Sequence, residues 1–182
     1  MDENEKKEWS RVVARFDKVC KIAHDKDVAL LIDAEESWMQ DAADDLVEEM
    51  MRKYNKQRAI VFNTLQMYRW DRLDYLKNLH EKAKKDGFFI GMKIVRGAYM
   101  EKERERAIKM NYPSPIQANK EATDQDYNLA LRFCIENISR ISIVAGTHNE
   151  KSNRILINLM EEFSLAIDDP RIFFAQLFGM SD

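Results

Sequence analysis

The segment DGFFIGMKIVRG, residues 86–97, contains the pattern that decides the fold. It opens with Gly87, a residue type that commonly ends a helix. The run 88–95 that follows is almost continuously apolar, as expected of a strand that is buried on both faces of a parallel sheet. A charged residue, Arg96, comes directly after the run. A helix end, a buried strand and a polar strand end in this order predict a parallel strand of an α/β protein.

The same alternation extends from this segment in both directions along the chain. Short apolar runs predict five strands, at residues 28–32, 59–63, 88–95, 141–146 and 171–177. Apolar residues at helical spacing predict helices near residues 4–23, 38–54, 70–85, 121–138 and 150–163. The remaining stretch, 100–120, is charged and then turns at Pro113 and Pro115, and its run EKERER at 101–106 is interpreted as a solvated helical face.

Polar residues after the five strands recur at intervals of roughly thirty positions, apart from one longer interval that contains the 100–120 insertion. A unit of this length is typical of an eight-fold barrel of roughly 250 residues. We therefore predict an α/β fold of the (β/α)8 TIM-barrel type, incomplete, with about five βα units. Residues 1–27 are expected to form an N-terminal helical segment and 28–182 a partial barrel. The alternative is a doubly wound sheet, which five units would complete.

Composition excludes several classes of function. The chain has 182 residues and a formal net charge of -3, with no basic stripe, which argues against a nucleic-acid partner. No apolar run reaches the eighteen or so residues of a membrane span, and the acidic start resembles neither a secretory signal nor a typical transit peptide. Cys20 and Cys134 occupy apolar helical positions and are predicted to be reduced and buried. No metal motif is evident.

Both architectures place the active site at the carboxyl ends of the strands, so we expect the polar strand tips to point toward a common centre. Asp33, with Glu35 and Glu36, either caps the next helix or belongs to a site. Gln66 is a weak helix capper and therefore favours a functional role. Arg96 favours an anion or an electron-rich ring, the alternative being a surface ion pair.

The remaining tip, Thr147-His148-Asn149, offers donors and acceptors before a helix start. His148 taken alone is more typical of a hydrogen-bonded structural histidine than of a catalytic base. Nothing resembles a nucleophile with its base. A polar, mildly cationic site of this kind suits a conjugated, anionic cofactor that performs the reaction itself.

Six strings identify the chain as resembling the proline dehydrogenase family over residues 28–182. They are DAEES (33–37), FNTLQMYRWDRL (62–73), KIVRGAYMEKERERA (93–107), YPSPIQANKEATDQDYN (112–128), AGTHNE (145–150) and FAQLFGMSD (174–182). The resemblance implies a distorted eight-stranded barrel that holds FAD non-covalently. It also implies oxidation of L-proline to pyrroline-5-carboxylate by hydride transfer to the flavin.

The resemblance also implies residue roles. At the flavin ring, the expected contacts are Thr64 and Gln66, with Lys93 and Arg96 near the reactive edge of the ring. Gly97 and Ala98 are expected to contact FAD through their backbone. For the rest of FAD, Lys120 is expected near the phosphates and adenosine, Thr147, His148 and Asn149 at the ribityl–diphosphate part, and Gln176 at a strand end. Positions expected near the substrate are Asp33 in the site floor, Tyr99 as an aromatic wall, and Leu177 below the substrate ring.

One departure from the family pattern concerns the substrate carboxylate. The family binds it with two arginines on its last helix and a lysine on its first strand, and neither segment is found in this sequence. Bidentate arginine recognition contributes strongly in a closed site. We therefore expect this chain to bind proline poorly or not at all, and FAD to be held by only part of its cradle. Unpaired strand edges of an open barrel predict self-association.

The family resemblance further implies a membrane quinone as electron acceptor. It implies a cytoplasmic or inner-membrane peripheral location in a bacterium, and the mitochondrial inner membrane in a eukaryote. Two other functions stay open on the residues alone. One is a different barrel enzyme, such as an aldolase or a metal-dependent hydrolase that uses Asp33, Glu35 and Glu36. The other is a non-catalytic fragment.

Overall fold

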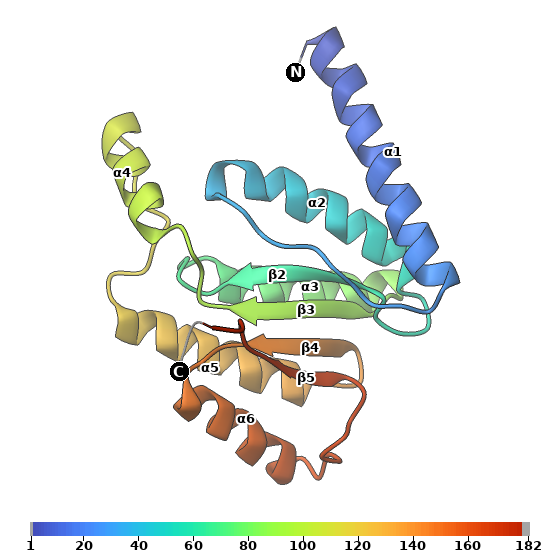
Figure 1. The fold of residues 1–182 in the computed structure, drawn as a ribbon, viewed down its shortest axis with the longest axis vertical. Coiled ribbons are helices and arrows are strands. Elements are labelled where there is room, and N and C mark those ends of the chain that lie inside the picture. The colour runs from blue at the N-terminus through green and yellow to red at the C-terminus, as the bar shows by residue number, and fades with distance from the viewer. Residues whose placement is uncertain (1, 180–182) are drawn as a thin grey trace.

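The computed structural model describes residues 2–179, which form a parallel sheet with helices packed on it (Figure 1). The strands are β1 Leu30–Leu31, β2 Val61–Gln66, β3 Ile90–Val95, β4 Ile141–Gly146 and β5 Ile172–Ala175. The helices are α1 Glu3–Asp25, α2 Ser37–Tyr54, α3 Arg72–Asp86, α4 Met100–Met110, α5 Lys120–Glu136 and α6 Glu150–Glu162. The predicted alternation of strands and helices is confirmed. Gly87 ends α3 in the left-handed conformation, with φ 67°.

The strand order in the sheet is β1-β2-β3-β4-β5, and every pair is parallel. Each strand therefore lies beside the strand that precedes it in the chain. A doubly wound sheet reverses direction at a switch point, whereas a barrel sheet advances strand by strand in one direction. The doubly wound alternative is therefore wrong, and the five strands form a half-barrel.

One hydrophobic core lies between the sheet and the helices. Buried residues of α1, α2, α3, α5 and α6 join those of β2 to β5 in a single cluster. Cys20 of α1 and Cys134 of α5 belong to it, and both are free and buried, as predicted. Burial raises the pKa of Cys20 to about 11. Because α1 shares this core, the expected division between residues 27 and 28 stays a prediction.

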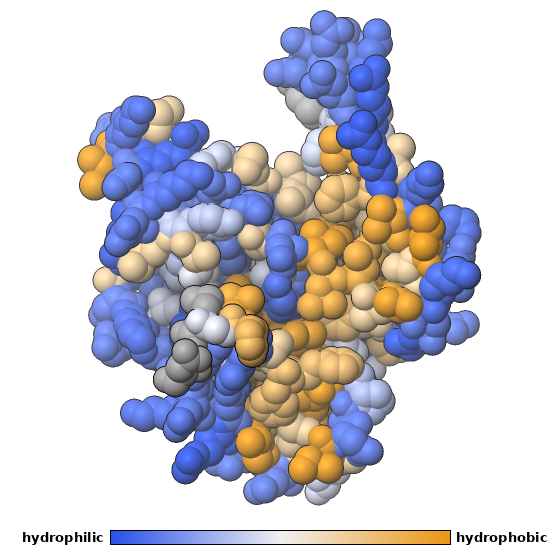
Figure 2. Space-filling model, viewed as in Figure 1, coloured by the Kyte–Doolittle hydropathy of each residue, from blue (hydrophilic) through white to orange (hydrophobic). Residues whose placement is uncertain are grey.

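The other face of the sheet carries no helix of this cluster. Side chains alternate along a strand, so Phe62, Thr64 and Gln66 lie opposite the core residues Val61 and Leu65. We call this the inner face. Its members by alternation and register are Leu31, Asp33, Phe62, Thr64, Gln66, Gly91, Lys93, Val95, Ser142, Val144, Gly146, Phe173 and Ala175. Figure 2 shows apolar residues gathered in the middle of the view, over the strands.

Two local expectations differ from the structure. The first strand has only two residues, and Leu31 is 41% exposed, so this edge strand is not buried on both faces. The charged run 101–106 is helical, but it is not solvated throughout, because Glu103 is fully buried. The burial of Leu31 and Glu103 depends on neighbouring strands and loops. A local apolar or charged pattern in the sequence carries no information about those neighbours.

The glycine at position 91 is required by the close packing of β2 and β3. A Cβ atom there would lie 2.6 Å from the Phe62 ring and 2.6 Å from the Val61 carbonyl oxygen. We expect Gly91→Ala to lower the free energy of unfolding by about 1 to 3 kcal/mol, because overpacking forces the backbone to move. Urea denaturation measures the change. Ser142→Ala, at the position of β4 paired with Gly91, is the control, and an equal midpoint for both variants would contradict the prediction.

Candidate active site

The centre of the inner face is a lysine held by an aspartate from the neighbouring loop. Lys93 pairs in register with Thr64 on β2 and with Val144 on β4. Its ammonium group donates a hydrogen bond to the carboxylate of Asp33, which follows β1. The lysine side chain is 21% exposed and that of Asp33 is 71% exposed. The inner face therefore presents a partly shielded cation beside an open carboxylate.

The end of β2 contacts the backbone that follows β1. Thr64 Oγ1 donates to the Ile32 carbonyl oxygen at 2.7 Å, and Gln66 Nε2 lies 3.5 Å from the Ala34 carbonyl oxygen. Gln66 is 4% exposed, and its Oε1 atom has no hydrogen-bond partner among the described residues. Buried polar atoms without a partner are uncommon and call for an explanation. This acceptor is available to a donor from a ligand on the inner face.

Arg96 is committed to the opposite side of the sheet. Its Nε donates to Asp124 Oδ1 at 2.7 Å, Nη1 to Thr147 Oγ1 at 2.6 Å, and Nη2 to Ser152 Oγ at 3.0 Å. Its guanidinium carbon lies 4.4 Å from the ring centroid of Tyr127. Because these partners come from α5, α6 and the end of β4, Arg96 ties three elements together on the helical side.

Residues 97–99 cross the end of the sheet after β3. Gly97 has φ 124°, and a Cβ atom there would lie 2.6 Å from ring atoms of Tyr68. A side chain is therefore excluded by both conformation and space. Ala98 is exposed. Tyr99 donates its hydroxyl to Glu35 Oε2 at 2.6 Å, and this hydrogen bond raises the tyrosine pKa above its usual value.

The turn Thr147-His148-Asn149 is fixed by hydrogen bonds at each residue. The Thr147 amide donates to the Ala175 carbonyl oxygen at 3.0 Å. His148 Nε2 accepts from the Leu177 amide at 3.2 Å. Asn149 caps α6, with its Oδ1 accepting from the Ser152 amide at 3.1 Å. The turn therefore joins β4, β5 and α6.

The remaining predicted residues lie at the margin. Lys120 opens α5 and donates to Asp124 Oδ2 at 2.6 Å, beside the Arg96 contact. Together the two cations lower the pKa of Asp124, against the opposing effect of burial. Gln176 and Leu177 are exposed after β5.

The tips do not point toward one common centre as expected. The structure divides them into an inner group, Asp33, Thr64, Gln66 and Lys93, and an outer group around Arg96, Thr147 and Lys120. The reason is the two-residue period of a strand, because Lys93 and Arg96 are three positions apart and so face opposite sides. The spacing within KIVR could have shown this separation.

Several residues of the outer group could not be selected from the sequence. Asp124, Tyr127 and Ser152 all contact Arg96, yet each lies inside a predicted helix and looks like an ordinary helical residue. The signal that could have found Asp124 is the spacing to Lys120, an i, i+4 pair at a helix start. No such local signal exists for Ser152.

The acidic residues Glu35 and Glu36, which follow β1, form hydrogen bonds with other side chains of the protein. Glu35 accepts from Tyr99, and Glu36 accepts from Lys102, which lowers the pKa of Glu36. Among residues 2–179, no cluster of three or more His, Cys, Asp or Glu side chains has the arrangement of a metal site.

Five parallel strands with polar residues at their carboxyl ends define part of an α/β barrel with its candidate active site at that end. The family model described as proline dehydrogenase matches residues 2–182. Proline dehydrogenase 1, mitochondrial, from Drosophila melanogaster is 38% identical over 188 residues, covering 98% of this chain and 28% of that protein. The human protein of the same name is 36% identical over 183 residues, covering 99% of this chain and 30% of that protein. The chain belongs to the proline dehydrogenase family.

A bacterial relative and a solved structure extend the comparison. The carbapenem antibiotics biosynthesis protein CarD from Pectobacterium carotovorum is 35% identical, covering 100% of this chain and 46% of that protein. The crystal structure of proline utilization A from Bdellovibrio bacteriovorus, inactivated by N-propargylglycine, superposes with a TM-score of 0.86 at 23% identity. It covers 94% of this chain and 18% of that chain, and it supports the fold. The chain thus spans less than half the length of these relatives.

Removing the Arg96 side chain should uncouple the outer group. Arg96→Ala leaves Asp124 and Thr147 without their partner, so we expect a loss of roughly 2 to 3 kcal/mol in the free energy of unfolding. Arg96→Lys should recover only part of the loss, because an ammonium group cannot reproduce the planar fork. Urea denaturation measures both. Arg154→Ala, on the exposed side of α6, is the control; if all three variants matched the wild type, the coupling would be refuted.

Proposed function

We propose that this chain provides part of the FAD cradle of an enzyme that oxidises L-proline to pyrroline-5-carboxylate. The observation that carries the proposal is the inner group, a buried unpaired acceptor on Gln66 beside the Lys93–Asp33 pair. Membership of the proline dehydrogenase family supports it. The chemistry that FAD supplies, when bound, is acceptance of a hydride from the ring carbon next to the proline nitrogen.

The residues of the inner face fit a flavin. The Gln66 Oε1 acceptor lacks a donor, and the isoalloxazine ring carries a ring N–H. Thr64 lies between Asp33 and Lys93 in the same row of the sheet. Gly97 has no side chain, so a ligand can approach its backbone closely. We propose that Thr64, Gln66 and Lys93, with the Gly97 and Ala98 backbone, hold the ring.

Lys93 has two consequences for the chemistry. A fixed cation stabilises negative charge that develops nearby, without reorganisation during the reaction. Lys93 also disfavours a second positive charge close to it, although its partner Asp33 acts in the opposite direction on a nearby proline amine. Hydride release requires a neutral amine. Asp33 holds the lysine in place, and Tyr99 is proposed as the wall beside the substrate, with Leu177 below it.

The outer group is proposed to hold the rest of the cofactor. Thr147, His148 and Asn149 lie at the start of α6, and Lys120 lies at the start of α5. Helix N-termini favour anionic groups such as phosphates. We propose that Arg96 acts mainly by fixing this turn, because its three donor contacts are already used within the protein. Gln176 continues the same edge after β5.

The substrate carboxylate is proposed to need further groups. Each of the three cations at these tips, Lys93, Arg96 and Lys120, already has a carboxylate partner. A carboxylate that enters beside them would compete with Asp33 or Asp124. We therefore keep the expectation that proline binds weakly to the residues described here.

The cellular location and the electron acceptor of the enzyme are also proposals. The animal relatives named above are mitochondrial by name. Within residues 2–179, no helix is long and apolar enough to cross a membrane. We propose a membrane quinone as electron acceptor, reached by a protein that lies at the surface of the mitochondrial or bacterial inner membrane.

The function is tested by adding FAD to the 182-residue chain and following flavin fluorescence and visible absorption. We expect saturable binding that Lys93→Ala weakens by roughly tenfold, the worth of one charge-assisted contact. Lys109→Ala, on the exposed side of α4, is the matched control. L-Proline added without oxygen should bleach the bound flavin weakly or not at all.

The two parts of this experiment fail separately. An unchanged flavin spectrum at every protein concentration would contradict the proposed cradle. Rapid bleaching by low concentrations of L-proline would support proline oxidation but refute the argument about the carboxylate. D-Proline is the control for specific recognition.

Apolar side chains on the inner face also lead us to propose self-association. Phe173 on β5 is 48% exposed and Leu31 on β1 is 41% exposed, and both lie on strands at the edges of the described sheet. Exposed strand edges readily pair with another chain. Light scattering during size-exclusion chromatography should show a mass that rises with concentration. Phe173→Ser should reduce the rise and Phe163→Ser on the helical side should not; a constant monomer mass would refute the proposal.

A further inference from the structure

Residues just before and at the start of α2 contact the start of α4. The proposed function does not explain these contacts. Four consecutive residues, 35–38, contact four residues of the α4 segment spaced i, i+3, i+4 and i+7. Residues at this spacing lie on one face of a helix. We call this set of contacts the α4 clasp. Its pairs are Tyr99–Glu35, Lys102–Glu36, Glu103–Ser37 and Arg106–Trp38.

Glu103 is the fully buried member of the clasp, whereas Glu36 is 8% exposed. Its Oε1 accepts from the Ser37 amide at 2.6 Å, and its Oε2 accepts from the Ser37 hydroxyl at 2.6 Å. The other contacts lie nearer the surface: Lys102 is 59% exposed, and Arg106 stacks on the Trp38 ring at 4.3 Å. Contacts of exposed charges contribute little on their own, so Glu103 is the member on which the clasp depends.

The helix that Glu103 contacts lacks a cap of its own. Glu36 stands at the N-cap position of α2 but makes no side-chain capping hydrogen bond, and the first turn contains no acidic residue. The first amide groups of a helix need acceptors, and negative charge is favoured there. Glu103 of α4 supplies an acceptor for the Ser37 amide and a negative charge at the start of α2. The start of α2 and the position of α4 are therefore coupled through one carboxylate.

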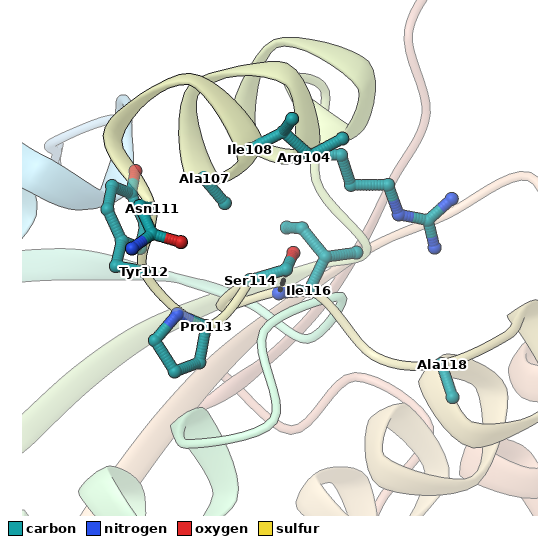
Figure 3. Close-up of a pocket in the computed structure, with 9 residues that line it drawn as sticks. All are labelled: Arg104, Ala107, Ile108, Asn111, Tyr112, Pro113, Ser114, Ile116 and Ala118. Carbon is teal, nitrogen blue, oxygen red and sulfur yellow. Dashed lines mark hydrogen bonds between the residues drawn. The ribbon is translucent and has the colours of Figure 1, made fainter.

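Among the described residues, none of α4 belongs to the main hydrophobic core. Figure 1 shows α4 beyond the ends of β2 and β3. On its other side a groove of about 850 Å³ opens toward loop 111–118 (Figure 3). A hydrogen bond from Arg104 Nη2 to the Gln117 carbonyl oxygen, at 3.1 Å, lies on that side.

We propose that Glu103 is a positioning residue, which caps α2 from α4 and thereby sets Tyr99 against Glu35. Tyr99 precedes α4 directly, and its carbonyl oxygen accepts from the Glu103 amide at 2.9 Å. Any movement of Glu103 away from Ser37 is therefore passed to Tyr99 within one helical turn. The consequence for catalysis rests on the proposed function, in which Tyr99 forms a wall beside the substrate.

Hydrogen exchange of the 182-residue chain without flavin tests the positioning role. Glu103→Ala should speed amide exchange in 36–40 and 99–106 together by about tenfold, because a lost cap and unpaired donors raise local opening. Glu105→Ala removes the same charge from the exposed side of α4 and should leave both segments unchanged. Glu103→Gln keeps an acceptor for the Ser37 amide and should restore most of the protection.

A double-mutant cycle separates positioning from general stability. Tyr99→Phe should lower the urea midpoint in the wild type and have no further effect in the Glu103→Ala background, since its partner is already displaced. If Glu103→Ala prevents folding, Ser37→Ala, which removes only the hydroxyl donor, takes its place. Equal exchange in the Glu103→Ala and Glu105→Ala variants, or additive effects with Tyr99→Phe, would overturn the proposal. Neither measurement depends on FAD or proline.

Discussion

The two-residue period of β3 is the constraint on which the site depends. It places Lys93 on the inner face and Arg96 on the helical side, although the two cations are three residues apart. The strands on either side complete each environment, with Thr64 and Asp33 around the lysine and Thr147 around the arginine. One central strand thus supplies a charge to the proposed flavin site on one face and, through Arg96, fixes the 147–149 turn on the other.

Local patterns predicted the strands and helices, but they did not decide between a barrel and a doubly wound sheet or predict the division of the site. The apolar runs and the glycine at position 87 predicted the strands and a helix end, because burial and backbone conformation are properties of short segments. The exclusion of a doubly wound sheet came only from strand order. The prediction placed Arg96 beside the flavin. Its contacts with Asp124 and Ser152 depend on how α5 and α6 pack on the sheet, which the local sequence does not specify. The role of each site residue stays a proposal.

Glu103 illustrates the same limit. Within EKERER it is one charge among six residues, and the surrounding charges predicted a solvated face. Its burial follows from a loop more than sixty residues earlier, whose helix start lacks an acceptor. A long-range cap of this kind leaves no local signal. The consequence is that α4, which lies outside the main core, is joined to the start of α2 by polar contacts that can be tested one at a time.

The central claim is that the inner face of β2 and β3 receives the flavin ring. Amide exchange of the chain with and without saturating FAD tests it most directly, because the peptides covering 62–68 and 91–99 contain Thr64, Gln66, Lys93 and Gly97. The account predicts slower exchange in both peptides when FAD is present, together with slower exchange at 145–150. Protection confined to the groove beside 111–118, or exchange that FAD leaves unchanged throughout, would contradict it.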